Sequence, residues 1–455
     1  MAKFLSGLGR FIQMTWNLIT ALRRGVGNLL FIAVLVLLVG VWFFHDGEQI
    51  PQGAALVFAP VGSIVEQTAE PLLMDRFSGR AVRREVPLRK LIDGIDHAAG
   101  DETIKVLLMD LRRLEWVGIS KLQEIGAALK RFRNNGKQII AFGEFFNQQQ
   151  YYLAAHADRI YLHPMGRIWI SGFGVYRKYI RSALDKLLIR FHVFRVGTYK
   201  SALEPFYRND MSVEAKEAST AWLGVLWDAY KNDIAELRGI DPGDLDAWIN
   251  ALDVYLARED GDAGRMALNL GLVDALMTRD EVSEELVGLV GRDRKNETYK
   301  QVSFGRYLDL VGPAIERSRT GHGKVGIIVA RGVIMEGRQP AGRIGGESMA
   351  ALIQRARQDT KIDALVLRIN SGGGSALASE IIRREVELTR SAGKPVVVSM
   401  SSVAASGGYW MAVSADEIWA LPTTITGSIG IFAALPTFER SLDALGIHTD
   451  GVGTT

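Results

Sequence analysis

Ser406 stands where a hydroxyl group could act as a nucleophile. It lies in residues 404–408 (AASGG), directly after the Val-rich run Pro395–Met400, which predicts a strand. A sharp turn at the end of that strand would expose the hydroxyl for attack on a carbonyl. The alternative is that Ser406 only caps the helix that follows, a common role for a serine in that position.

A glycine run supplies a second candidate for chemistry. Residues 369–375 (INSGGGS) follow the predicted strand Ala364–Ile369 and precede the predicted helix Leu377–Arg390. Bare backbone amides would therefore face an anion bound before the helix. A nucleotide phosphate loop is the rival interpretation, but the run has neither G-x-G-x-x-G spacing nor a Gly-Lys-Ser/Thr ending. An oxyanion hole fits the run better.

A serine nucleophile needs a general base, and Lys200 is the candidate. No histidine is close in sequence to Ser406 or to the glycine run, although folding could bring one there. Lys200 would serve only if its pKa fell from about 10.4 toward 7, and burial is the effect large enough to cause that. The alternative is a surface lysine paired with Glu204, which is worth roughly a few tenths of a kcal/mol.

These candidates belong to a chain whose pattern repeats. Short Val/Ile/Leu runs alternate with longer periodic stretches, which predicts an α/β fold. Residues 151–164 (YYLAAHADRIYLHP) match residues 409–422 (YWMAVSADEIWALP). We therefore predict a tandem duplication of one α/β unit, with a join near Gly291–Gly323 and a helical extension of the first copy between Val213 and Val287.

The two copies differ where the chemistry is expected. Gln148 stands in the first copy where Ser406 stands in the second, and residues 112–116 (RRLEW) replace the glycine run. An amide is not a nucleophile, and bulky side chains would keep a carbonyl group away from the backbone. We interpret this as a division of labour in which the second copy supplies the nucleophile and the first copy supplies Lys200.

The composition excludes several classes of function. The chain has 54 basic and 51 acidic residues, a net charge of +3, so it has no field that would attract nucleic acid. It contains no cysteine, which excludes disulfides, thiolate nucleophiles and cysteine-ligated metals. The expected chemistry requires neither a cofactor nor a metal.

The N-terminus predicts a membrane anchor. Residues 26–44 are apolar apart from Asn28 and are long enough to cross a bilayer. Basic residues precede this stretch and no acidic residue appears before Asp46, so the positive-inside rule predicts a cytoplasmic N-terminus. The alternative is a cleaved signal peptide, whose apolar region is usually shorter.

With these features the chain resembles the signal peptide peptidase A family, in its long, duplicated form called protease four. The resemblance rests most specifically on residues 197–206 (GTYKSALEPF), 405–410 (ASGGYW) and 426–430 (TGSIG), and it covers nearly the whole chain. It implies crotonase-like and Clp-protease-like repeats preceded by one transmembrane helix. The implied domains are a basic cytoplasmic segment (1–25), the anchor (26–44), a first repeat with its helical extension (45–320) and a second repeat (321–455).

The resemblance also assigns roles to single residues. It implies that Ser406 is the nucleophile, that Lys200 is its base and that the Ser428 hydroxyl orients the lysine. It further implies that Gly373 and Gly407 supply the oxyanion-hole amides.

The biology implied by the resemblance is the degradation of remnant signal peptides and other short apolar peptides. The family acts as a homo-oligomer, a tetramer in the long form, on the periplasmic side of the bacterial inner membrane. Two departures limit the transfer. Gly372 stands where the family usually has proline, from which we expect slower turnover, and the chain stops at Thr455, short of the family's C-terminal part. The alternatives are a catalytically silent membrane scaffold and an acyl-CoA hydrolase or hydratase on the same fold.

Overall fold

The structure is a computed structural model that describes residues 14, 16, 22–36, 50–70, 84–295, 297–318 and 323–454. The chain divides into two compact units, residues 1–50 and 51–455. In the first unit, residues 22–36 form a helix with exposed side chains. Within the described residues no helix combines the length and apolarity needed to span a membrane. Residues 37–44 of the predicted anchor lie outside the described ranges.

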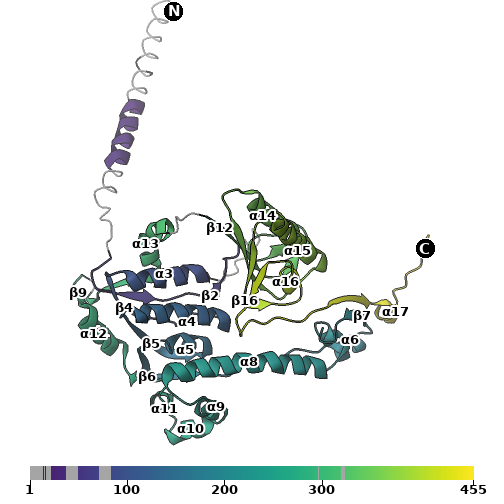
Figure 1. Ribbon diagram of the computed structural model, residues 1–455, viewed down its shortest axis with the longest axis horizontal. Helices are drawn as coiled ribbons and strands as arrows, with labels where there is room; N and C mark the ends of the chain where they lie inside the picture. Colours follow the sequence, from purple (N-terminus) through teal and green to yellow (C-terminus); the bar gives the residue numbers. More distant parts are fainter. Residues whose placement is uncertain are drawn as a thin grey trace, which may run out of the picture. The chain divides into compact units, whose positions relative to one another are not determined.

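The larger sheet of the second unit has the strand order β11-β1-β4-β5-β6-β8 (Figure 1). Every neighbouring pair in it is parallel. Its strands are β1 (Ala54–Phe58), β4 (Ile104–Met109), β5 (Gln138–Asn147), β6 (Arg159–Trp169), β8 (Ala275–Leu276) and β11 (Gln301–Ser303). Parallel neighbours need crossover connections, and helices α4 (Ile119–Asn134) and α5 (Gln148–Ala154) provide two of them.

Apolar side chains hold helices against this sheet. Val282 and Leu286 of α12 (Arg279–Val290) pack in one buried cluster with Val106 and Ile140 of the strands. Helix α3 (Leu88–Gly100) packs against α4. Burial of these side chains is what stabilises the helices, since short amphipathic helices are marginal by themselves.

The second parallel sheet has the order β12-β15-β16-β17. Its strands are β12 (Val325–Arg331), β15 (Ala364–Ser371), β16 (Val396–Ala404) and β17 (Glu417–Trp419). Helices α14 (Gly346–Gln358) and α15 (Ala376–Ser391) pack together, and their apolar faces share a core with the sheet that includes Ile353, Leu367, Ile382 and Val398.

Short strands and helices complete the second unit. The segment in which the sequence predicts a helical extension contains α8 (Val213–Arg238), α9 (Pro242–Asn250), α10 (Leu252–Arg258), α11 (Ala263–Asn269) and α12. The small strands are β2 (Ser63–Val65), β3 (Glu85–Pro87), β9 (Arg292–Asp293), β10 (Thr298–Tyr299), β13 (Ile334–Met335) and β14 (Ile344–Gly345).

An antiparallel ribbon, β7 (Arg190–Val196) with β18 (Ile431–Thr437), connects segments of the two predicted copies. Figure 1 shows α6 (Arg181–Lys186) and α17 (Glu439–Ala444) beside this ribbon. The remaining short helices are α7 (Glu204–Tyr207) and α16 (Gly407–Trp410).

The region near the predicted join contains more regular structure than its sequence indicated. In the described part of Gly291–Gly323, β9 and β10 form a hairpin and β11 pairs with β1. Helix α13 (Phe304–Ser318) follows and packs against α3. The strands are too short for a periodic pattern to reveal them.

Candidate active site

Ser406 occupies a strained turn at the carboxyl end of a central strand. β16 ends at Ala404 and α16 begins at Gly407. Between them Ser406 adopts φ 51° and ψ −119°, a conformation that costs a residue with a side chain about 1–3 kcal/mol. Its backbone N–H donates to the Gly427 carbonyl oxygen at 2.9 Å, which holds the turn. The Ser406 side chain makes no capping hydrogen bond, contrary to the capping interpretation.

Lys200 reaches the hydroxyl of this serine. Its Nζ lies 2.7 Å from Ser406 Oγ and 2.7 Å from the Ser428 carbonyl oxygen. Ser428 Oγ is farther away, at 3.4 Å. The structure therefore brings together Ser406 and Lys200, which the residue pattern singled out, and Ser428, which the resemblance implied. The shorter contact from Ser428 comes from its carbonyl group and not from its hydroxyl group.

The ends of the ribbon place Lys200 beside Ser428. Gly197 and Gly430 follow and precede the paired strands, with positive φ angles of 109° and 132°. A Cβ atom on Gly430 would lie 2.1 Å from the Val196 carbonyl oxygen, and one on Gly197 would lie 2.7 Å from a carbonyl oxygen of the facing segment. Glycine at both positions thus allows the two backbones to approach closely.

Burial lowers the pKa of Lys200 below its ordinary value. Only 6% of the residue is exposed, and desolvation disfavours the ammonium form. Glu204, the candidate partner in the surface-lysine interpretation, is itself buried and accepts hydrogen bonds from the backbone N–H of Ser212, at 3.2 Å, and from its hydroxyl. The surface-lysine interpretation is therefore wrong.

The glycine run lies against the serine turn. Gly373 has φ 101°, and a Cβ atom there would lie 2.8 Å from the Gly407 nitrogen. The Gly373 N–H donates to Ser371 Oγ at 3.1 Å, and that hydroxyl donates to the Gly332 carbonyl oxygen at 2.7 Å. The Gly373 N–H therefore already has an acceptor inside the loop. An oxyanion would have to share this N–H with Ser371 Oγ or take the place of that hydroxyl. Gly407 begins a helix, where backbone amides have no intrahelical partner.

Gly372 stands in open space. A Cβ atom built there meets no atom within 4 Å, so the position has room for a Cβ atom. The effect of glycine is therefore added backbone freedom at the start of the turn rather than a changed contact.

The counterpart of this site in the predicted first copy is built differently. Gln148 is buried, and its Oε1 accepts the Ser171 N–H at 3.1 Å. Trp116 and Gln148 line a cavity of about 320 Å³ together with Ser402 and Val403, which belong to the predicted second copy. An amide engaged in this way offers no nucleophile.

Within the described residues no alternative base or metal site accompanies Ser406. The histidines described there have other polar partners, namely Tyr307 for His97, Tyr152 for His156, Met165 for His163, Thr437 for His192 and Asp443 for His448. No group of His, Asp and Glu side chains in the described ranges could hold a metal ion.

Two residues near the lysine and the glycine run escaped the sequence reasoning. Ser371 holds the glycine turn, and its place in the INSGGGS run was the available signal. The Phe432 ring centroid lies 5.9 Å from Lys200 Nζ, a contact that no sequence pattern indicated.

An α/β fold that presents a serine on a strained turn beside a buried lysine is the arrangement of a serine peptidase. The profile of Peptidase family S49 matches residues 131–291 and 389–455. The chain is 40% identical to Protease 4 of Salmonella typhi, over 100% of this chain and 73% of that protein. The chain belongs to peptidase family S49 and is a serine peptidase.

Other relatives agree with this assignment. Protease 4 of Haemophilus influenzae is 37% identical, over 98% of this chain and 73% of its own length. The chloroplastic serine protease SPPA of Arabidopsis thaliana is 28% identical, over 90% of this chain and 58% of its own length. Among solved structures, the match to a membrane-bound stomatin-specific protease covers 58% of this chain and 99% of that chain, at 11% identity and a TM-score of 0.28.

Proposed function

We propose that the peptidase uses Ser406 as its nucleophile and Lys200 as its general base. The observation that carries this proposal is the 2.7 Å contact between Lys200 Nζ and Ser406 Oγ. A neutral amine at that distance can accept the hydroxyl proton as the oxygen attacks. Burial of Lys200 lowers its pKa, which favours the neutral amine that a general base requires.

The reaction then proceeds through an acyl-enzyme. Ser406 Oγ forms a bond to the peptide carbonyl carbon, and its proton moves to Lys200 Nζ. The lysine donates that proton to the leaving nitrogen as the peptide bond breaks. A water molecule then attacks the ester while its proton passes to Lys200, and Ser406 recovers a proton as the second product leaves.

Three further residues assist in this proposal. Ser428 holds the lysine, chiefly through its carbonyl oxygen at 2.7 Å. The amides of Gly407 and Gly373 stabilise the oxyanion, the latter after giving up or sharing its bond to Ser371. No metal and no cofactor takes part.

We further propose that the scaffold is a tandem duplication of a crotonase-like and Clp-protease-like unit. Both parallel sheets support this, because β1-β4-β5-β6 and β12-β15-β16-β17 occur in the same order. Helices α6 and α17 begin at Arg181 and Glu439, and strands β6 and β17 begin at Arg159 and Glu417. Both pairs have the spacing that separates Tyr151 from Tyr409 in the matching sequence segments.

The proposed substrates are remnant signal peptides and other short apolar peptides. A relative from Enterococcus faecium named putative signal peptide peptidase SppA, 30% identical over 95 residues, supports this class. The proposed location is the bacterial inner membrane, with residues 26–44 as a single-pass anchor and the catalytic part on the periplasmic side. The apolar sequence of that stretch and the basic residues before it support the location.

We also propose a homo-oligomer, a tetramer by resemblance. The ribbon supports this, because it carries large apolar side chains that are more than half exposed, among them Phe194, Val196, Ile431 and Leu435. An apolar surface of this kind typically marks a contact with another protein.

Trapping the acyl-enzyme tests the proposal. The purified protein would be incubated with an activated ester of a short apolar peptide, and the adduct would be located by mass spectrometry after proteolysis. We expect the acyl group on Ser406 and no adduct in the Ser406→Ala variant. An acyl group on another residue, or none despite measurable peptide hydrolysis, would contradict the assignment.

A further inference from the structure

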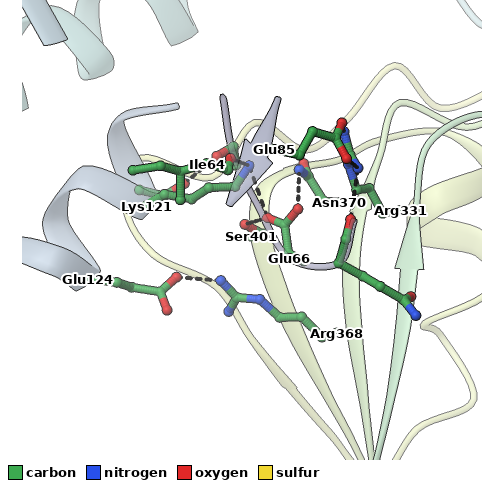
Figure 2. A network of polar contacts seen from close by, with 12 residues as sticks. Ile64, Glu66, Glu85, Lys121, Glu124, Arg331, Arg368, Asn370 and Ser401 are labelled. Carbon is green, nitrogen blue, oxygen red and sulfur yellow. Dashed lines mark hydrogen bonds and ion pairs between the residues drawn. The ribbon is translucent and has the colours of Figure 1, made fainter. Parts of the chain in front are cut away.

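A buried ion pair lies close to the strands that carry the site. Glu66 directly follows β2 and Lys121 belongs to the first turn of α4, and each side chain is only 2% exposed. Lys121 Nζ lies 3.2 Å from Glu66 Oε1 and also donates to the Ile64 carbonyl oxygen at 3.2 Å (Figure 2). A cation in the first turn opposes the helix dipole, and removing both charges from water is unfavourable. Folding of α4 alone does not account for such a pair.

The Glu66 carboxylate bridges two strands of the second sheet. Oε2 accepts a hydrogen bond from Asn370 Nδ2 at 2.9 Å, and Oε1 accepts one from the Ser401 hydroxyl. Asn370 belongs to β15 and Ser401 belongs to β16 (Figure 2). Burial alone would raise the pKa of Glu66, but the Lys121 charge and these two hydrogen bonds hold it below its ordinary value. The carboxylate is therefore ionised at neutral pH and accepts from both strands.

The bridge lies where the pairing between the two strands is interrupted. β15 and β16 pair in regular register up to Ile369, opposite Met400, and the register shifts before Ser371, which lies opposite Ala404. Asn370 is the residue between these two pairs. An irregularity of this kind removes ladder hydrogen bonds and often occurs next to an active site. The Glu66 carboxylate therefore links β15 to β16 at the point where the regular backbone pairing of the two strands is interrupted.

Both strands lead directly into the proposed machinery. β15 runs into the glycine turn that contains Gly373, and β16 runs into Ser406. We propose that Glu66 is a positioning residue for the peptidase, whose carboxylate sets the glycine turn against the nucleophile by holding β15 and β16 together. Lys121 keeps that carboxylate charged. This inference rests on the proposed roles of Ser406 and Gly373.

Neighbouring ion pairs provide a matched control. Arg331 of β12 binds Glu85 at 2.7 Å, and Arg368 of β15 binds Glu124 (Figure 2). The Glu85 pair also joins β3 to the second sheet, but it reaches β12, which carries neither the nucleophile nor the glycine turn. A role limited to holding the sheets together would make Glu85 and Glu66 equivalent.

The test compares the double variant Glu66→Gln/Lys121→Met with Glu85→Gln. The double variant removes both buried charges, so that neither is left unpaired. Both variants would be assayed for peptide hydrolysis, normalised to the folded fraction, and for binding of a peptide boronate that mimics the tetrahedral intermediate. We expect the double variant to lose about tenfold to a hundredfold in kcat and in boronate affinity, with KM within about twofold, because a misplaced oxyanion donor affects only the transition state. Glu85→Gln should retain both values within about twofold, because its ion pair reaches β12 and neither of the two strands that run into Gly373 and Ser406.

Equal kcat and boronate affinity in the double variant and the natural protein would overturn the inference while leaving the dyad intact. Failure of the natural protein to acylate Ser406 would instead overturn the proposed function, so the two failures are distinguishable. Should the double variant not fold, Ser401→Ala and Asn370→Leu each remove one arm of the bridge. Each should lower kcat and boronate affinity together without raising KM, and unchanged values in both variants would refute the positioning role.

Discussion

Lys200 Nζ and Ser406 Oγ lie 2.7 Å apart, although 206 positions separate the two residues in the chain. The antiparallel pairing of β7 with β18 brings these distant parts of the chain together. It places the segment after Val196, which contains Lys200, beside the segment before Ile431, which contains Ser428. The strained turn after β16 then directs the Ser406 side chain toward Lys200.

Replacing the lysine should abolish most of the activity. Lys200→Ala removes the proposed base, and general bases contribute about 10²–10⁴ in rate, so we expect kcat to fall by that factor. Steady-state hydrolysis of an apolar peptide measures it. Lys216→Ala, at an exposed position on α8, is the control and should leave kcat unchanged. A kcat for Lys200→Ala within about threefold of the natural value would lie outside the range for a lost general base.

The glycine turn should not tolerate a methyl group at Gly373. The alanine Cβ would lie 2.8 Å from the Gly407 nitrogen at a φ of 101°, so Gly373→Ala must displace the turn. We expect a loss of at least about tenfold in kcat, measured with the same peptide. Gly372→Ala is the matched control because its Cβ meets nothing within 4 Å. Equal activity of the two variants would argue against a role for this turn.

The close approach at the end of the ribbon should also be needed for activity. Gly430→Ala would place a methyl group 2.1 Å from the Val196 carbonyl oxygen and force β18 away from β7. Because Lys200 follows β7, we expect kcat to fall while the melting temperature changes little, since no side chain of β7 or β18 is fully buried. Gly224→Ala, with nothing within 4 Å, is the control. Retained kcat in Gly430→Ala would show that the ribbon does not set the lysine.

Removal of the buried carboxylate near the lysine should destabilise the fold. Glu204→Ala leaves the N–H and hydroxyl of Ser212 without their acceptor at the start of α8, at a cost of about 1–3 kcal/mol. Urea denaturation measures the change in the free energy of unfolding. Glu217→Ala, on the exposed side of α8, should change that free energy by less than about 0.5 kcal/mol. A change below about 0.5 kcal/mol for Glu204→Ala as well would contradict a structural role for this carboxylate. It would be the result expected for a surface ion pair between Lys200 and Glu204.

Much of the scaffold could be predicted from periodicity. The runs predicted as strands at 364–369 and 395–400 correspond to β15 and β16, because each is a short apolar stretch bounded by polar residues. Periodicity missed the short strands β9, β10 and β11, whose few residues contain no repeat.

Only part of the candidate site could be predicted from the sequence. Ser406 and the glycine run could be singled out because both follow apolar strands. Lys200 could not be distinguished from a surface lysine by spacing, since its burial arises from the ribbon and from contacts with Ser428. Glu66 left no signal at all, because its partners Asn370 and Ser401 lie 304 and 335 positions away.

The most direct test of the dyad is the pH dependence of fluorophosphonate labelling. Lys200 is the base only when neutral, and burial lowers its pKa. The labelling rate of the natural protein should therefore rise with pH through a midpoint below the ordinary lysine value of about 10.4 and then level off. Lys200→Arg should label slowly without that rise, and Ser406→Ala should not label. A natural protein that labels with the same profile as Lys200→Arg would contradict the dyad.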